Sequence, residues 1–98
     1  MKNPIEALNK LFDSRIRLGV MSILIVNDGV SFNELKQLLD LTDGNLASHL
    51  NTLEQAEYLS IQKAFIGKKT NTTYRITALG KQAFKSHLDA LEKMIKGI

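Results

Sequence analysis

The sequence contains no cysteine and a single proline among its 98 residues. Without thiols, the chain has no disulfides, no thiolate metal sites and no cysteine nucleophile. It also lacks a long apolar run, because its most apolar stretch, residues 18–26, is far too short to span a bilayer. The N-terminal residues show no basic segment followed by an apolar core and a small-residue cleavage site. We therefore expect no secretory leader, no membrane partner and a cytoplasmic location.

Signatures of catalysis and of cofactor binding are also missing. The sequence contains no Gly-rich phosphate loop and no nucleophile elbow. Its two histidines, His49 and His87, have no acidic neighbours at ligand spacing, so they do not form a metal site. We favour a helix-packing role for His49, which lies between Leu46 and Leu50. We expect no enzyme activity, no cofactor and no metal.

Charge is distributed unevenly along the chain, although the formal net charge is only +3. Residues 1–40 balance five cations against five acids, and residues 41–57 carry acids but no cation. Residues 58–77 carry no acid and four cations, which are Lys63, Lys68, Lys69 and Arg75. Such a cluster is typical of an element that contacts phosphates. A solvated turn is the alternative explanation.

The length and the 44% hydrophobic content predict one domain, residues 1–98, with a modest core. A helix is predicted over residues 4–12, with Asn3 as its cap and Pro4 in the first helical position. Asp13 is predicted to cap a second helix over residues 14–27. That helix is apolar on most sides, so we expect it to be the buried central helix. Gly29 then suits the left-handed conformation that ends a helix.

Residues 31–58 predict two helices joined by a tight turn. Asn33 is expected to cap the first, over residues 34–40, whose inner face is Leu35, Leu38 and Leu39. Thr42 is expected to cap the second, over residues 43–56. Its core-facing side consists of residues at helical spacing, namely Leu46, His49, Leu50 and Leu53. Its polar residues face outward, and these are Asn45, Ser48, Asn51, Thr52 and Gln55.

The remaining residues predict a β-hairpin and a long helix. Strands are expected at residues 58–65 and 72–76, with a turn over residues 66–71. Their inward side chains are predicted to be Leu59, Ile61, Tyr74 and Ile76. Thr77 is expected to cap a last helix over residues 78–96. The predicted fold is therefore mainly α with a small β-hairpin wing, a winged helix-turn-helix.

The last helix carries a spacing of apolar residues that is typical of a coiled-coil seam. The seam residues, at intervals of 4, 3, 4 and 3, are Phe84, Leu88, Leu91, Ile95 and Ile98. We expect this face to meet a second copy of the chain in a homodimer. Ile5, Leu8 and Phe12 from the helix at residues 4–12 are expected to join the same interface. The alternative is one wide apolar stripe packed on a single core.

The outward face of the helix over residues 43–56 suits the major groove of DNA. Small residues allow close approach, Asn forms bidentate contacts with adenine, and Ser or Thr contacts several base edges. Backbone amides at the helix start can hold a phosphate, and Asp43 either accepts from cytosine or complements the helix dipole. The predicted contacts on this helix are Thr42, Asp43, Gly44, Asn45, Ser48, Asn51 and Thr52. Those on the wing are Lys63, Lys68, Lys69, Thr70, Asn71 and Arg75.

The predicted recognition helix contains no Arg or Lys. Affinity for double-stranded DNA is therefore expected to come from the wing, helped by Arg15, Arg17 and Lys36, and from pairing two subunits on a two-fold site. We expect a sequence-specific transcriptional regulator associated with the nucleoid. The absence of cations on the helix also favours an alternative, a winged helix that binds another protein and no DNA.

Residues 41–58, from Leu41-Thr-Asp-Gly-Asn to Tyr58, and residues 65–81 resemble a family of small bacterial and archaeal winged-helix regulators related to the MarR and ArsR repressors. Residues 13–19 resemble the start of their first long helix. The resemblance implies a homodimer on operator DNA, with residues 43–56 in the major groove and residues 67–72 near the minor groove or backbone. Two features depart from the family. A basic residue is usual where Ala47, Asn51 or Thr52 stands, and the metal-sensing thiolates of ArsR are absent. The sequence identifies no small-molecule effector.

Overall fold

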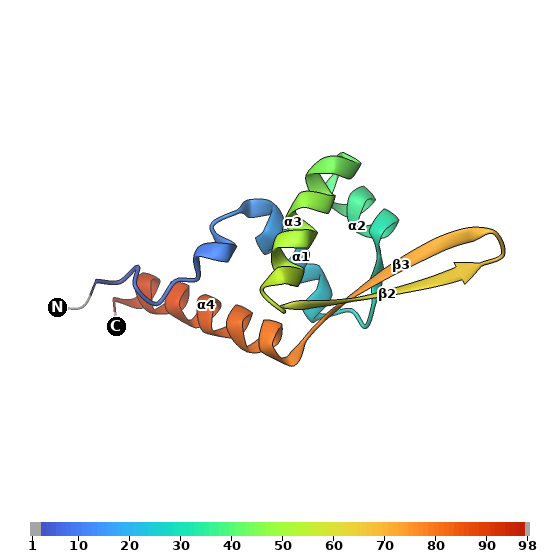
Figure 1. Ribbon diagram of the computed structural model, residues 1–98. Helices are drawn as coiled ribbons and strands as arrows, with labels where there is room; N and C mark the ends of the chain where they lie inside the picture. Colours follow the sequence, from blue (N-terminus) through green and yellow to red (C-terminus); the bar gives the residue numbers. More distant parts are fainter. Residues whose placement is uncertain (1–2, 98) are drawn as a thin grey trace.

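The computed structural model describes residues 3–97. Its elements are the 3-10 helix η1 (Lys10–Phe12), α1 (Arg15–Ile25), β1 (Val30–Ser31), α2 (Phe32–Leu39), α3 (Asp43–Gln55), β2 (Leu59–Ile66), β3 (Lys69–Ile76) and α4 (Ala78–Lys96). The strands form an antiparallel sheet in the order β1-β3-β2. Helices α1 to α3 pack together, whereas the β2–β3 hairpin and α4 extend in opposite directions (Figure 1). This is the predicted winged helix-turn-helix, with four α-helices and a small sheet. Among residues 3–97, no helix is long and apolar enough to cross a membrane.

Two of the predicted helix starts are confirmed by their capping hydrogen bonds. The Thr42 hydroxyl oxygen accepts from the Asn45 backbone N–H at 3.3 Å, and α3 begins at the next residue. The Thr77 hydroxyl oxygen accepts from the Gly80 N–H at 2.9 Å, and α4 follows. In both cases a local side chain satisfies a backbone donor that the helix itself leaves unpaired.

The predicted helix over residues 4–12 is wrong. Residues 4–7 form turns, and only Lys10–Phe12 are helical, as η1. The reason is a long-range contact at Asn9, whose backbone N–H donates to His87 Nδ1 on α4 at 3.0 Å. Asn9 is therefore extended, and its side chain caps η1 by accepting from the Leu11 N–H.

The caps predicted for α1 and α2 are also wrong. Ser14, and not Asp13, caps α1, because its hydroxyl accepts from the Arg17 N–H at 3.2 Å. The helix ends at Ile25, before the predicted Asn27. Ser31, and not Asn33, caps α2 through a capping box with Glu34. A reciprocal pair of bonds satisfies two backbone donors, so α2 begins at Phe32.

The hairpin has longer strands and a shorter turn than predicted. Its ladder runs from the pair Leu59–Ile76 to the pair Ile66–Lys69. Only Gly67 and Lys68 form the turn, and Gly67 has a φ of +67°. Glycine adopts this left-handed conformation without strain, which permits a tight two-residue connection. Residues 69–71, predicted as turn, therefore continue the strand.

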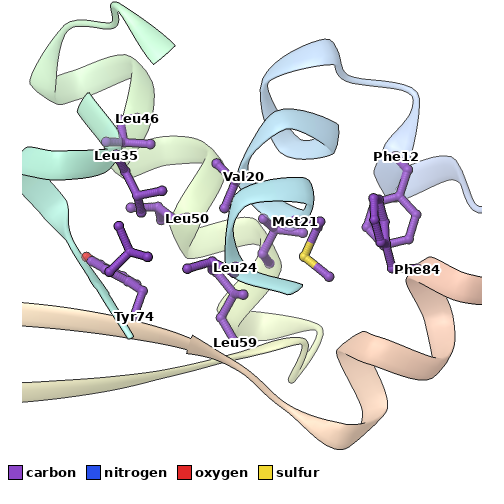
Figure 2. Close-up of a cluster of buried hydrophobic side chains, with 12 residues drawn as sticks. Phe12, Val20, Met21, Leu24, Leu35, Leu46, Leu50, Leu59, Tyr74 and Phe84 are labelled. Atoms are coloured by element: carbon purple, nitrogen blue, oxygen red, sulfur yellow. The ribbon is translucent and has the colours of Figure 1, made fainter. Parts of the chain in front are cut away.

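The main core lies between α1, α2, α3 and the sheet, as Figure 2 shows. Its fully buried side chains are Val20, Met21, Leu24, Leu35, Leu46, Leu50 and Leu53. Three of them come from α1, so this helix is central as predicted. The predicted inner face of α2 is only partly correct, because Leu38 is 66% exposed.

A second part of the core joins η1 to α4. Phe12 and Phe84 are each 3% exposed, and their rings meet edge to face with centroids 5.6 Å apart (Figure 2). Neither side chain is available to a second subunit, so their assignment to a dimer interface is wrong. Helix α4 turns Phe84, His87 and Ala90 toward the body of its own subunit. The predicted seam is thus divided between the core and the surface.

Candidate nucleic-acid interface

Helix α3 has one buried and one exposed face. Leu46, Leu50 and Leu53 are at most 2% exposed and attach the helix to the core. The opposite face carries the predicted base-contacting residues Asn45, Ser48 and Asn51, which are all exposed, together with Gln55. Thr52 lies at the edge of this face, half-buried, and its hydroxyl donates to the Ser48 backbone oxygen at 3.1 Å.

The start of α3 combines free space with a local ion pair. A Cβ atom added to Gly44 would meet no atom within 4 Å, so the fold does not require glycine there. Asp43 Oδ1 lies 2.8 Å from Lys36 Nζ of α2. This pair places a cation beside the N-terminus of α3. It also engages the Asp43 carboxylate, for which a contact with cytosine was one of the two predicted roles.

An interaction beneath the exposed face ties α3 to α1. Arg17 Nη1 lies 2.9 Å from His49 Nδ1, and Arg17 Nε donates to the Leu11 backbone oxygen at 2.6 Å. Burial, and then the nearby Arg17 charge, lower the pKa of His49 below its usual value. His49 thus has the expected helix-packing role. Arg17 has a structural role in joining α3 to α1, and its help in phosphate binding stays a prediction.

The wing carries the exposed cations. Lys63, Lys68 and Lys69 are exposed, as is Thr70, while Asn71 is half-buried. Within residues 3–97, none of these three lysines forms an ion pair. They lie in the distal half of the hairpin, between the pair Lys63–Thr72 and the turn at residues 67–68. The tip of this hairpin extends past the helices (Figure 1). Their charge is therefore available to a polyanion.

Arg75 differs from the three wing lysines because it lies at the base of the hairpin and has protein partners. Its Nε lies 3.3 Å from Asp28 Oδ1, and its Nη1 donates to Gln62 Oε1 at 2.8 Å. The structure thus separates Arg75 from the other predicted wing cations. Its first role is to connect β3 with β2 and with the loop that follows α1.

Sequence reasoning missed two features. The first is the buried His87, which accepts a hydrogen bond from the Asn9 backbone N–H. The side-chain amide of Asn9 in turn donates to the Tyr58 hydroxyl at 2.9 Å. His87 is three residues from both Phe84 and Ala90, a helical spacing that could have indicated its burial. The second is Phe65, which is 80% exposed near the tip of the wing. Among the described residues, no group of three or more His, Cys, Asp or Glu side chains is placed to hold a metal ion.

Comparison with known proteins identifies the family. The family model described as a winged helix DNA-binding domain matches residues 16–95. The chain belongs to this family. It is also 35% identical over 89 residues to an uncharacterized protein of Methanocaldococcus jannaschii, covering 91% of this chain and 97% of that protein.

Solved structures support this assignment. The transcriptional regulator homologue protein from Pyrococcus horikoshii OT3 is 32% identical, with a TM-score of 0.82 over 89% of this chain and 86% of that one. Bacillus subtilis PadR, solved in complex with operator DNA, has a TM-score of 0.68 over 76% of this chain and 48% of PadR. At 14% identity, PadR shares the fold alone.

Proposed function

We propose that this protein is a sequence-specific transcriptional regulator that inserts α3 into the major groove and lays its wing on the backbone or in the minor groove. One observation carries the proposal: an exposed polar face lies directly opposite the buried leucines of α3. The family is described as DNA-binding, and the Pyrococcus relative is named a transcriptional regulator homologue. PadR, which shares the fold, was solved on operator DNA.

Helix α3 has the chemistry for reading bases. The major groove is about 12 Å wide and admits one helix. Gly44 and Ser48 keep the approaching surface small, while Asn45 and Asn51 supply amides that pair with adenine. The backbone N–H groups after Thr42 offer a phosphate site at the helix N-terminus, where the helix dipole favours negative charge.

The wing supplies the charge that α3 lacks. Most of the affinity for duplex DNA comes from neutralising phosphates, and each contact adds to the salt dependence. Lys63, Lys68 and Lys69 are exposed and form no ion pair among residues 3–97, whereas Lys36 is shared with Asp43. Thr70 and Asn71, on the strand that follows, offer further polar contacts. Binding should therefore depend more on the wing than on the helix, while sequence preference should depend on the helix.

A homodimer would give a chain with few cations two sets of phosphate contacts. Helix α4 retains exposed apolar residues after Phe84 is placed in the core, with Leu88 at 42% and Ile95 at 87% exposure. Leu91, half-buried, lies between them, and Ile5 is 59% exposed on the N-terminal segment, near the half-buried Leu8. Ile98 lies outside the described residues. Figure 1 shows α4 and the N-terminal segment extending together from the body, where two subunits could meet.

The shape of the subunit supports the same proposal. Its radius of gyration is 15.0 Å, whereas about 13 Å is typical of a compact domain of this length. Both the hairpin and α4 extend from the body and contribute to this value (Figure 1). The protruding α4 exposes apolar surface that a second copy would cover. Replacing Ile95 by Asp should therefore give folded monomers in sedimentation experiments. An unchanged mass would contradict this interface.

A second candidate function is a winged helix that binds a protein partner. It is favoured by the absence of Arg and Lys from α3, whose exposed residues include Asp43 and Glu54. Such a partner would have to complement the basic wing. The two candidates differ in whether duplex DNA alone forms a complex.

The test is selection of bound fragments from random duplexes, followed by affinity measurements over a range of salt concentrations. The double variant Lys68→Ala, Lys69→Ala should reduce the magnitude of the slope of log K against log[salt] by about 1 per lysine. The reason is that fewer counterions are released on binding when a phosphate contact is lost. A matched control is Lys85→Ala, Lys93→Ala on α4, which removes the same charge outside the wing and should leave the slope close to wild type. Failure of the wild-type protein to retard any duplex at low salt would favour the protein-binding candidate.

A further inference from the structure

The tip of the wing exposes two neighbouring large apolar side chains. Phe65 is 80% exposed and Ile66 is 67% exposed. The sheet contributes to the core only near its base, through residues such as Leu59 and Tyr74. Figure 1 shows that the tip lies beyond all the helices. A single exposed apolar residue is ordinary, but an aromatic and an aliphatic residue together on a projecting tip suggest a contact surface.

The strand register assigns these two side chains to opposite faces of the hairpin. Phe65 pairs with Thr70, and Ile66 pairs with Lys69. Because side chains alternate along a strand, Phe65 shares its face with Leu59 and Ile61, which pack toward the helices. Phe65 therefore lies at the outer end of the face on which α3 is found, whereas Ile66 faces away.

Cations lie close to Phe65 in the hairpin. Lys63 precedes it by two residues on the same face, Lys68 is in the turn, and Lys69, which pairs with Ile66, lies on the other face. No acid occurs between residues 58 and 77. The tip thus combines a flat apolar ring with several positive charges. A base step of a duplex matches this combination, because it offers a stacking surface between two rows of phosphates.

We propose that Phe65 is an apolar wedge that the wing inserts into the minor groove beside the α3 site, partly unstacking one base step and bending the duplex. This inference rests on the proposed function and adds a contact to it. The two strands of the hairpin lie about 4.8 Å apart, and the minor groove is only about 6 Å wide. A side chain at the tip can enter where the whole hairpin cannot, and partial unstacking opens the groove toward it.

If Phe65 unstacks a base step, the protein should also prefer certain DNA sequences at that step, although no polar side chain contacts the bases there. Pyrimidine–purine steps such as TA unstack and kink most easily. Such a step should therefore recur at a fixed distance from the α3 contacts in the selected duplexes. A bend toward the major groove would bring the duplex against α3.

The experiment uses the duplex recovered by the selection, with 2-aminopurine replacing one adenine at a time in the flanking steps and a fluorophore pair on its ends. The wild-type protein should raise 2-aminopurine fluorescence at one step and shorten the end-to-end distance. Phe65→Ala should abolish both changes and weaken binding about tenfold, a loss typical of one aromatic–base contact. The salt slope should not change, because no phosphate contact is removed.

Ile66→Ala is the matched control, since it removes an exposed apolar side chain from the same tip on the other face. It should retain both fluorescence changes, and both variants should melt like the wild-type protein. If Phe65→Ala keeps the 2-aminopurine signal and the wild-type affinity, the wedge is wrong while DNA binding stands. Equal losses in the two variants would also overturn it. If the wild-type protein binds no duplex at all, it is the proposed function that fails.

Discussion

The two faces of α3 differ in burial and in the reason for their residue types. On the inner face, Leu46, Leu50 and Leu53 are enclosed by other elements and exclude water almost completely. On the outer face, Gly44 has open space around it, and Asn45 and Ser48 are exposed. Packing therefore explains the residue types on the inner face and leaves those on the outer face unexplained. Such a contrast is what we expect when a stable scaffold presents a surface for something else.

The hairpin repeats this contrast along its length. At its base, Leu59 and Tyr74 are buried in the core, and Arg75 is held by Asp28 and Gln62. At its tip, Phe65 and the lysines have no such support. In both elements the structural role and the proposed DNA-binding role fall on different residues. Variants should therefore separate stability from DNA binding.

The largest effect on stability is expected on the inner face of α3. Leu50→Ala should lower the free energy of unfolding by about 2–5 kcal/mol, because it removes buried contacts and leaves a cavity. Ser48→Ala, two residues away on the exposed face, should change it by less than about 0.5 kcal/mol. Chemical denaturation of both variants measures the difference. Equal losses would show that the two faces of α3 are not distinct.

A smaller effect, dependent on pH, is expected at the boundary between the faces. The pKa of His49 is lowered by burial and then by Arg17, so below its ordinary value of 6.5 the unfolded chain binds a proton that the folded chain does not. The contribution of neutral His49 to the free energy of unfolding is fully present above the pKa that this side chain has in the unfolded chain, and it is lost as the pH falls toward the pKa in the folded chain. Between about pH 7 and about pH 5.5, the wild-type free energy of unfolding should therefore fall more than that of His49→Gln. Parallel curves in denaturation experiments would remove His49 as the cause.

The smallest effect on stability is expected at Gly44, where binding should change instead. Gly44→Ala should leave the subunit as stable as wild type, or more stable by up to about 1 kcal/mol, because alanine favours a helix and meets no atom. If α3 approaches DNA closely at its start, the added methyl group should weaken binding to the selected duplex. Unchanged affinity in a titration would show that the helix start does not touch the duplex.

Local signals in the sequence predicted much of this fold. The hydroxyl caps at Thr42 and Thr77, the apolar spacing of α3 and the alternation of the β2–β3 strands all act over a few residues. For that reason, α3 and α4 were found close to their observed bounds, and the hairpin was found with its turn too long. The exposed residues of the candidate site follow from the same pattern, because the helical spacing of the buried leucines places the polar residues of α3 on the opposite side.

The errors arose where distant segments compete with local preference. A capping signal at Asn3 predicted a helix, but the bond from Asn9 to His87 holds that segment in another conformation. The spacing of Phe84 with Leu88 and Ile95 indicated one apolar seam, and no local rule states which part of it faces inward. Arg17 looked like any surface cation until its partner His49 was placed beside it.

The sequence alone therefore determined where α3, α4 and the hairpin lie, where the wing carries its lysines and which side of α3 is polar, because these depend on neighbouring residues. Only the tertiary structure decided that Phe12 and Phe84 belong to the core, that Arg17 and Arg75 have protein partners, and that Phe65 is left exposed. Such outcomes depend on which surfaces meet after the chain folds, and packing between segments far apart in sequence settles them.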